Sequence, residues 1–360
     1  MGNSVQALVT EPGVRHSTRV TEVEPATAGP DEVLLRVLEV GVCGTDREIV
    51  HGLFGVPPEG SGSLVLGHEA LAVVERDGHG FGRGDLVTAT VRRSCRHCVA
   101  CADGAPDSCL TGDYSERGIT RLDGFARELV AEDPAQLVAI PRSLGRLGVL
   151  AEPTSICSRA LRHVRAIGDR QPWRLQRALV LGAGSVGTLS TFLLRLLGVD
   201  VWVASLEHAA DPRADVLATC GARYVSTADT RLDELRTETG GFDLVIEAAG
   251  DAQLTADSLP LLRRSGIVCV LGIDGRDQHV TLDGRVLGVD LILENRVVFG
   301  SVNAHRKDWM DGVQALDRVR ERWPGTLDAL VARRLPLDRF EEALAYRGGK
   351  ATLVLDDQLL

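Results

Sequence analysis

The spacing of hydrophobic positions changes near residue 150. Before that point, short apolar runs alternate with polar positions at a period of two and are separated by Gly, Pro and Asp; the clearest cover 32–42, 64–75, 85–91 and 126–131. Alternation of this kind with closely spaced turns is typical of β-strands. The first 150 residues are therefore predicted to form a β-rich domain.

Between about 155 and 305, short continuous apolar runs alternate with helical stretches. Strands are predicted over 178–181, 199–204, 242–248 and 266–271, with helices over 185–197 and 212–220. This alternation implies right-handed crossovers and a parallel sheet. The remaining chain predicts an amphipathic helix over 309–322, a short helical segment over 335–344 and a final strand over 351–355. The expected fold class is α/β plus β.

Composition narrows the class of protein. The chain has 360 residues, of which 44% are hydrophobic and 25% charged, and its net charge is −10. This acidic balance argues against a nucleic-acid partner. The start of the chain has no signal-peptide pattern, and no apolar run approaches the roughly 20 residues that span a bilayer. Eight cysteines without an export signal indicate reduced thiols and a cytoplasmic location.

Four of these cysteines share one turn-rich segment. Cys95, Cys98, Cys101 and Cys109 follow the spacing Cys-x2-Cys-x2-Cys-x7-Cys, with Gly104 and Pro106 between the last two. Thiolate sulfurs lie about 2.3 Å from zinc, so such ligands must come from a tight loop. The alternative is disulfides or scattered free thiols. A four-thiolate zinc site would be closed, and its chemistry would be structural.

A glycine-rich turn lies in the second part of the chain. Gly182-Ala-Gly184-Ser185-Val186-Gly187 follows the predicted strand 178–181 and opens the predicted helix 185–197. In this context the glycines allow a tight turn and let a pyrophosphate approach the helix N-terminus. The alternative is a packing turn in a βαβ unit that binds no nucleotide.

The end of the next predicted strand bears on the choice of cofactor. An acidic residue there would accept hydrogen bonds from the adenosine ribose and repel a 2′-phosphate. Ser205 occupies the expected position and Glu207 follows two residues later. The sequence therefore favours NAD over NADP, unless Glu207 is only a solvated surface acid.

A second set of potential metal ligands lies in the β-rich part. Cys43-Gly-Thr45-Asp46 follows a predicted strand, Gly67-His68-Glu69 comes about 25 residues later, and Glu152 lies near the domain junction. One thiolate, one imidazole and one carboxylate can hold zinc while leaving a position open for water or substrate. Each of these residues alone would more often be part of a core.

The order of these motifs resembles that of the zinc-dependent medium-chain alcohol dehydrogenases over essentially the whole chain. Within that superfamily, segments 43–48, 66–69, 92–95, 123–125 and 299–303 are most similar to archaeal-type glucose 1-dehydrogenases. The resemblance implies a GroES-like catalytic domain of residues 1–155 and 306–360. It also implies a Rossmann coenzyme domain with a doubly wound parallel sheet over 156–305, a cleft between the domains, and a homodimer or homotetramer.

The resemblance also implies roles for single residues. Cys43, His68 and Glu69 match catalytic zinc ligands, and Glu152 matches a fourth ligand or substrate contact. Thr45 matches the start of a proton relay. Glu116 matches an acid that binds sugar hydroxyls, and Asn303 matches a residue at the nicotinamide. His305, Arg306 and Lys307 follow Asn303, where a basic side chain could meet a cofactor phosphate. Two zinc ions per chain are expected.

Three positions depart from the family pattern. Val91 stands where the sugar dehydrogenases commonly have a sugar-binding Asn before Arg92-Arg93. Ser205-Leu206-Glu207 replaces an Asn-Arg-Arg type of 2′-phosphate site. Glu48 replaces the relay histidine of many alcohol dehydrogenases, and His51 lies nearby without an assigned role.

The predicted function is hydride transfer between a sugar, polyol or cyclitol hydroxyl and a nicotinamide cofactor. A biosynthetic ketone reductase or a sorbitol-like polyol dehydrogenase is the alternative among enzymes. A non-enzymatic zinc-binding module is the alternative of another class, and a dehydrogenase relative with a structural role is a third. The expected partner is a small molecule, with no nucleic acid and no membrane.

Overall fold

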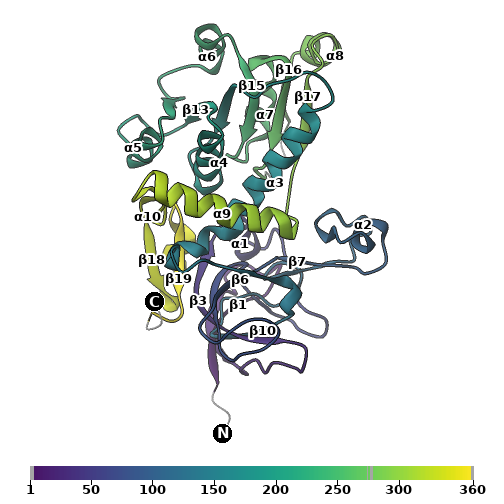
Figure 1. The fold of residues 1–360 in the computed structure, drawn as a ribbon, viewed down its shortest axis with the longest axis vertical. Helices are drawn as coiled ribbons and strands as arrows, with labels where there is room; N and C mark the ends of the chain where they lie inside the picture. Colours follow the sequence, from purple (N-terminus) through teal and green to yellow (C-terminus); the bar gives the residue numbers. More distant parts are fainter. Residues whose placement is uncertain (1–3, 274, 276–278, 358–360) are drawn as a thin grey trace. The chain divides into compact units, whose positions relative to one another are not determined.

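The computed structural model describes residues 4–273, 275 and 279–357 (Figure 1). The chain divides into two compact units. The first contains residues 1–155, Asn303–Asp317 and residues 331–360, and the second contains Ile156–Val302 and Arg318–Leu330.

The first unit is mostly β-structure, as its alternating pattern predicts. Its elements are β1 (Val5–Thr10), β2 (Arg19–Val23), β3 (Val33–Val42), α1 (Gly44–Val50), β4 (Leu64–Val65), β5 (Glu69–Val74), β6 (Leu86–Ala89), β7 (Arg92–Arg93), α2 (Val99–Ala102), η1 (Pro106–Ser108), β8 (Ser115–Arg117), β9 (Arg121–Leu122), β10 (Leu129–Glu132), η2 (Pro134–Gln136), β11 (Leu137–Ala139) and η3 (Gly145–Leu150). The C-terminal part adds β18 (Arg333–Pro336), η6 (Leu337–Arg339), α11 (Phe340–Ala345) and β19 (Ala351–Val354).

Strand β3 organises this unit. The largest sheet has the order β11-β6-β5-β3-β19-β18, and β10 also pairs with β3. Two three-stranded sheets, β2-β1-β4 and β7-β8-β9, complete it. Leu35 and Val37 of β3, together with Val40 beyond a bulge between Val37 and Glu39, lie in one buried apolar cluster with β5, β6 and β10. The chain therefore brings the end of β3, where Cys43 follows, next to the starts of β5 and β19.

One predicted strand is interrupted. The apolar run 64–75 forms two strands, β4 and β5, because Gly67 adopts a left-handed φ of 89° between them. A Cβ at this position would lie 2.6 Å from Cγ1 of Val40, so only glycine fits. The break ends the first strand, and His68 and Glu69 follow it at the start of β5.

The second unit is built on a parallel six-stranded sheet. Its elements are α3 (Ala151–Gly168), which begins in the first unit, β12 (Arg177–Leu181), α4 (Ser185–Leu196), β13 (Asp200–Ser205), α5 (Pro212–Thr219), β14 (Arg223–Ser226), α6 (Leu232–Thr239), β15 (Phe242–Glu247), α7 (Ala252–Ser258), η4 (Leu259–Leu261), β16 (Leu262–Val270), η5 (Val286–Asp290), α8 (Leu291–Leu293), β17 (Val297–Gly300) and α10 (Thr326–Leu330). The strand order β14-β13-β12-β15-β16-β17 is doubly wound around β12.

The C-terminal part differs from its prediction in two ways. The segment 335–344, expected to be helical, begins with β18, which pairs in parallel with β19, and becomes helical only at η6 and α11. Helix α9 (Arg306–Arg322) begins in the first unit and ends in the second. Residues Arg318–Leu330, expected with the catalytic part, belong to the second unit. There Trp323 stacks on Phe192 of α4, with ring centroids 6.1 Å apart.

Among the residues that the structure describes, no helix combines the length and the apolar character needed to cross a bilayer.

Candidate active site

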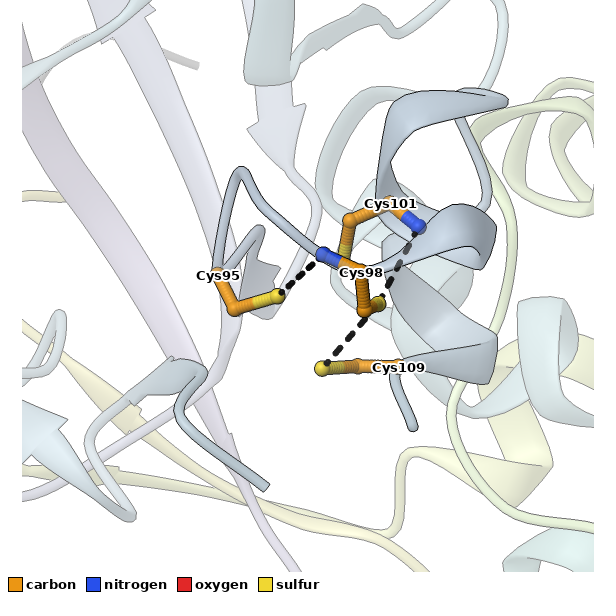
Figure 2. Close-up of side chains that lie close together, drawn as sticks. All are labelled: Cys95, Cys98, Cys101 and Cys109. Carbon is orange, nitrogen blue, oxygen red and sulfur yellow. Dashed lines mark hydrogen bonds between the residues drawn. The ribbon is translucent and has the colours of Figure 1, made fainter. Parts of the chain in front are cut away.

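The four cysteines of the turn-rich segment converge (Figure 2). Cys95 follows β7, Cys98 is the N-cap of α2, Cys101 lies within α2, and Cys109 follows η1. Their sulfur atoms all lie within 4.8 Å of one another. The sulfurs of Cys98 and Cys109 are 3.9 Å apart. Ligands about 2.3 Å from a tetrahedral zinc ion are about 3.8 Å apart, so this set fits zinc.

Local hydrogen bonds lower the pKa of two members of this cluster, Cys95 and Cys109, whereas burial raises the pKa of Cys101. The backbone N–H groups of Cys98 and Cys101 donate to the sulfurs of Cys95 and Cys98, each at 3.4 Å. Hydrogen bonds from the Thr111 hydroxyl and from nearby backbone amides lower the pKa of Cys95 to about 5. Because thiolate is the form of cysteine that binds metal, the loop is suited to a zinc ion. Its four sulfurs would fill all four coordination positions of that ion.

The second cluster forms where β3 ends. Cys43, His68 and Glu69 offer ligand atoms that lie within 4.8 Å of one another, and Sγ of Cys43 is 3.2 Å from Nε2 of His68. His68 and Glu69 are buried, at 4% and 1% exposed, and Cys43 is half-buried. These are three of the four residues expected at the catalytic metal. The set leaves room for a further ligand, as zinc sites with substrate access do.

Asp46 orients two members of this cluster. Its carboxylate accepts a hydrogen bond from the Cys43 backbone N–H at 2.9 Å, which caps α1. Its other oxygen lies 3.6 Å from Nδ1 of His68, and within the described part of the chain neither atom has a hydrogen-bond partner. A metal-binding histidine commonly turns its second nitrogen toward a carboxylate. Nε2 is therefore the nitrogen that faces the metal position, which supports a zinc site here.

Glu69 is held by a lysine that the sequence analysis did not include. Both of its carboxylate oxygens accept hydrogen bonds from Nζ of Lys350, at 2.7 and 2.6 Å. Lys350 precedes β19, and Glu69 begins β5, on opposite sides of β3. The Glu69 side chain crosses over Gly41, where a Cβ would lie 2.0 Å from Oε2. Glu69 is the one carboxylate in the otherwise apolar strand β5, and a charged side chain in such a strand indicates that a buried cation must pair with it.

Glu152 lies near this cluster but outside the set of ligand atoms that converge. It stands in the first turn of α3 and is 8% exposed. Burial raises its pKa to about 7, while the charge of His68 opposes this and the charge of Glu69 adds to it. The residue thus shares the electrostatic environment of the metal cluster, and its role as a fourth ligand stays a prediction.

Thr45 and His51 lie on α1 and at its end. Thr45 is half-buried, two residues after Cys43 in the first turn of the helix. His51 is exposed, and its Nδ1 donates to the backbone carbonyl of Arg47 at 2.7 Å. This bond caps the end of α1, so His51 has a structural explanation.

Glu116 and Asn303 contact each other. Nδ2 of Asn303 donates to Oε1 of Glu116 at 2.9 Å, and Arg92 forms a buried ion pair with the same oxygen at 3.0 Å. Both are buried, at 7% exposed each. The sugar-binding acid and the nicotinamide-binding amide predicted from the family thus form one hydrogen-bonded group, although the sequence separates them by 187 positions.

The three glycines of the predicted nucleotide turn lie in different structural environments. Gly187 packs against the strand end, because a Cβ there would lie 1.9 Å from the carbonyl oxygen of Gly182. Gly182 has a φ of 100°. Gly184, the N-cap of α4, faces open space, and nothing lies within 4 Å of its Cβ position. Gly184, Ser185 and Val186 thus surround the helix N-terminus, where backbone amides can receive a pyrophosphate.

The end of β13 carries a charged group that includes a residue the sequence analysis did not assign. The Ser205 hydroxyl donates to Glu207, and Nη2 of Arg213 pairs with Oε1 of Glu207 at 2.9 Å. Partial burial opposes ionisation, but the hydrogen bond from Ser205 and the charge of Arg213 lower the pKa of Glu207. Glu207 is therefore a fixed carboxylate. Arg213, in the first turn of α5, supplies the positive charge of this group.

Comparison with known proteins supplies the family. Residues 29–142 match the model of the alcohol dehydrogenase GroES-like domain, and residues 145–356 match the model of the glucose dehydrogenase C-terminus. The chain belongs to the glucose dehydrogenase family of zinc-dependent medium-chain dehydrogenases. The family and the fold class predicted from the motifs are both confirmed.

Relatives in this glucose dehydrogenase family align over nearly their full length. The chain is 37% identical to glucose 1-dehydrogenase of Methanocella arvoryzae, covering 94% of this chain and 96% of the relative. It is 37% identical to glucose 1-dehydrogenase of Thermoproteus tenax, covering 98% and 100%. The solved structure of Haloferax mediterranei glucose dehydrogenase in complex with NADP, Zn and gluconolactone is 30% identical, with a TM-score of 0.89 over 97% of this chain and 99% of that one.

The buried pair between Glu69 and Lys350 generates a stability prediction. We expect Lys350→Met to lower the free energy of unfolding by about 3–5 kcal/mol, because it leaves the Glu69 carboxylate buried without a partner. The double variant Lys350→Met/Glu69→Gln should recover a large part of this loss, since no charge then stays buried. Urea denaturation of the metal-free protein measures both values.

The exposed pair between Lys307 and Asp311 provides the control. Their charged atoms are 2.7 Å apart, but both side chains are about half exposed or more. Lys307→Gln should therefore change the free energy of unfolding by less than about 1 kcal/mol. A loss for Lys350→Met as small as that of this control would contradict the argument.

Proposed function

We propose that this protein is a zinc-dependent dehydrogenase that oxidises the anomeric hydroxyl of glucose or a closely related aldose with a nicotinamide cofactor. The observation that carries the proposal is the buried, incomplete ligand set of Cys43, His68 and Glu69 in a chain that also has a dinucleotide-type turn. Glucose 1-dehydrogenases at 37% identity, aligned end to end, support the choice of a sugar.

The reaction removes two hydrogens from the hemiacetal group of the sugar, the one on carbon as a hydride and the one on oxygen as a proton. The C–H bond at the anomeric carbon breaks, and its electron pair leaves with the hydrogen to reduce the nicotinamide ring. The hydroxyl proton goes to solvent, and the C–O bond gains double-bond character, so the ring sugar becomes a lactone. A zinc ion bound at Cys43 and His68 would supply Lewis acidity that lowers the pKa of the reacting hydroxyl.

Residues of the first unit prepare this step. Asp46 caps the start of α1 and places its second carboxylate oxygen 3.6 Å from Nδ1 of His68, where it can orient the ring when Nε2 binds zinc. Lys350 holds Glu69 in one orientation beside them. Thr45, two residues after Cys43 in the first turn of α1, would receive the hydroxyl proton. Glu116 would accept hydrogen bonds from sugar hydroxyls.

The experiment is a rate measurement on the purified protein together with metal analysis. Initial rates with NAD and NADP are followed through the absorbance of the reduced cofactor over a panel of aldoses, cyclitols and linear polyols. We expect aldoses to be the best substrates, and zinc analysis to give two ions per chain. Cys43→Ala should retain one zinc and lose at least about 100-fold in turnover.

Each other function class has its own outcome in this experiment. A non-enzymatic zinc-binding module would show no turnover with any hydroxylated substrate. A preference for linear polyols or ketones over aldoses would favour the polyol dehydrogenase or ketone reductase. Val91 favours this alternative to a sugar dehydrogenase. It is 4% exposed and offers no polar group at the position where sugar dehydrogenases commonly have Asn.

NAD is the cofactor that the end of β13 favours, and we propose it as the preferred one. Glu207 is ionised and fixed by Ser205 and Arg213, so it can accept from the ribose hydroxyls and repel a 2′-phosphate. The Haloferax relative, in contrast, was solved with NADP. Arg213 is the cation beside Glu207 through which this chain could use NADP, and Asp211 also holds its guanidinium, at 2.7 and 2.8 Å.

Glu207→Gln tests this assignment. We expect the ratio of kcat/KM for NADP to that for NAD to rise about tenfold, since the amide does not repel the phosphate and leaves Asp211 as the one carboxylate paired with Arg213. Asp215→Asn, on the exposed face of α5, removes the same charge nearby and should leave the ratio unchanged. An unchanged ratio for Glu207→Gln would exclude Glu207 from cofactor selection.

We propose a homodimer formed at β17. In the described part of the sheet, β17 pairs only with β16, so one edge of this strand has unpaired backbone groups. Exposed apolar side chains accompany it on consecutive elements: Leu287, Ile292, Leu293, Val298 and Val302. An edge strand beside an apolar patch is suited to pairing with the same strand of a second copy.

Val298→Lys tests the dimer. A lysine on an edge strand opposes pairing, so light scattering during size exclusion should show the mass per particle halved relative to the unchanged protein. Val14→Lys, at another exposed valine in the first unit, should leave the mass unchanged. A monomeric unchanged protein would rule out the interface.

A cytoplasmic location is also proposed. All eight cysteines are free thiols, and five of them belong to the two groups of side chains that are arranged to bind metal. Such sites need a compartment that keeps thiols reduced.

A further inference from the structure

We propose that the four-cysteine lobe, residues 95–109, positions Asn303 and Glu116, and that Arg92 and His305 are the two positioning residues that transmit this effect. The lobe is then more than a local support, because its order sets the affinity for cofactor and sugar. The inference rests on the proposed function for the roles of Asn303 and Glu116, but its contacts stand independently of it.

Arg92 joins the lobe to Glu116. Its Nη1 donates to the backbone carbonyl of Asp107, in η1 just before Cys109, at 2.9 Å. Its Nε and Nη2 both lie 3.0 Å from Oε1 of Glu116. The guanidinium also covers the Tyr114 ring, with its central carbon 3.8 Å from the ring centroid. Because a guanidinium is a rigid plane, a shift of the Asp107 carbonyl moves the group that holds the carboxylate.

Glu116 in turn determines where the side chain of Asn303 lies. The same Oε1 accepts from Nδ2 of Asn303 at 2.9 Å, and Oδ1 of Asn303 accepts from the Ala304 backbone N–H at 2.8 Å. Asn303 has a φ of 65°, a left-handed conformation that Asn adopts more readily than most residues. The side chain is therefore oriented by its hydrogen bonds to Glu116 and to the Ala304 backbone.

His305 makes a second, direct connection. Its Nδ1 accepts a hydrogen bond from the Lys307 backbone N–H at 3.1 Å, so in the neutral ring Nε2 carries the proton. Nε2 donates to the carbonyl of Gly104 at 2.9 Å, and Gly104 lies between the third and fourth cysteines. His305 is one of the basic residues expected near a cofactor phosphate. In the structure its Nε2 contacts the four-cysteine lobe.

The lobe depends on its metal for order. Between Cys95 and Cys109 the regular structure consists of the four-residue helix α2 and the three-residue turn η1. Four thiolates within 4.8 Å of one another repel unless a cation lies among them. Metal binding to such a loop is coupled to its folding. Loss of the metal should therefore release both the Asp107 and the Gly104 carbonyl, and with them the geometry at Asn303.

The test compares variants of the full-length protein by cofactor affinity. His305→Phe keeps an aromatic ring but removes the bond to Gly104, and Arg92→Lys keeps the charge but cannot reach Asp107 and Glu116 in one plane. Each should raise the dissociation constant for NADH and NADPH, measured by their fluorescence, by about three- to tenfold. Each should also raise KM for sugar while both zinc ions are retained. Arg339→Gln, whose exposed side chain pairs with Glu342, is the control and should have no effect.

A double variant separates positioning from general loss of structure. Cys109→Ser should release one zinc and raise the same dissociation constants. In the Cys109→Ser background, His305→Phe should add nothing further, because its partner is already disordered. Additive effects, or His305→Phe and Arg92→Lys values equal to the control, would overturn the proposal. Absence of sugar turnover in the unchanged protein would refute the proposed function, whereas the cofactor measurements would still decide this inference.

Discussion

The first unit depends on how it neutralises negative groups in its interior. Cys43, Asp46, Glu69 and Glu152 all lie in one electrostatic neighbourhood, and three of them are carboxylates. Charges removed from water interact strongly and are stable only when paired. Lys350 supplies one permanent positive charge through its two bonds to Glu69. A zinc ion at Cys43 and His68 would supply the rest, which explains why these ligands belong together in the fold.

The strand arrangement makes this neutralisation possible. β3 lies between β5 and β19, so residues from positions 43, 69 and 350 meet at one end of the sheet. Gly41 leaves the space that the Glu69 side chain crosses to reach Lys350. Gly67 provides the break that places His68 before β5. Backbone positions without side chains therefore shape the centre as much as the ligands do.

The two metal clusters follow different principles. The four-cysteine lobe draws all its ligands from one short segment, and its hydrogen bonds connect it to Glu116, Asn303 and His305 in the same unit. The cluster at Cys43 draws its ligands from separate strands and shares them with Asp46 and Lys350. The first therefore acts on the rest of the unit through backbone carbonyls, and the second through the charges of its side chains.

The sequence by itself determined what is local in this protein. The four cysteines, the glycine-rich turn, the strand–helix alternation and the apolar runs all act over short distances along the chain, and they were sufficient to predict the family and the fold class. Local patterns failed where long-range pairing decides the outcome, as in β18, which becomes a strand only because β19 lies beside it.

Only the tertiary structure decided which charges meet. Lys350 lies 281 positions from Glu69, and Asn303 lies 187 positions from Glu116, so no spacing rule connects them. His305 likewise bonds to the carbonyl of Gly104, 201 positions away. Side-chain partners at such distances depend on strand order and backbone direction. The residues that orient the candidate site, unlike its ligands, could therefore be found only once the chain was folded.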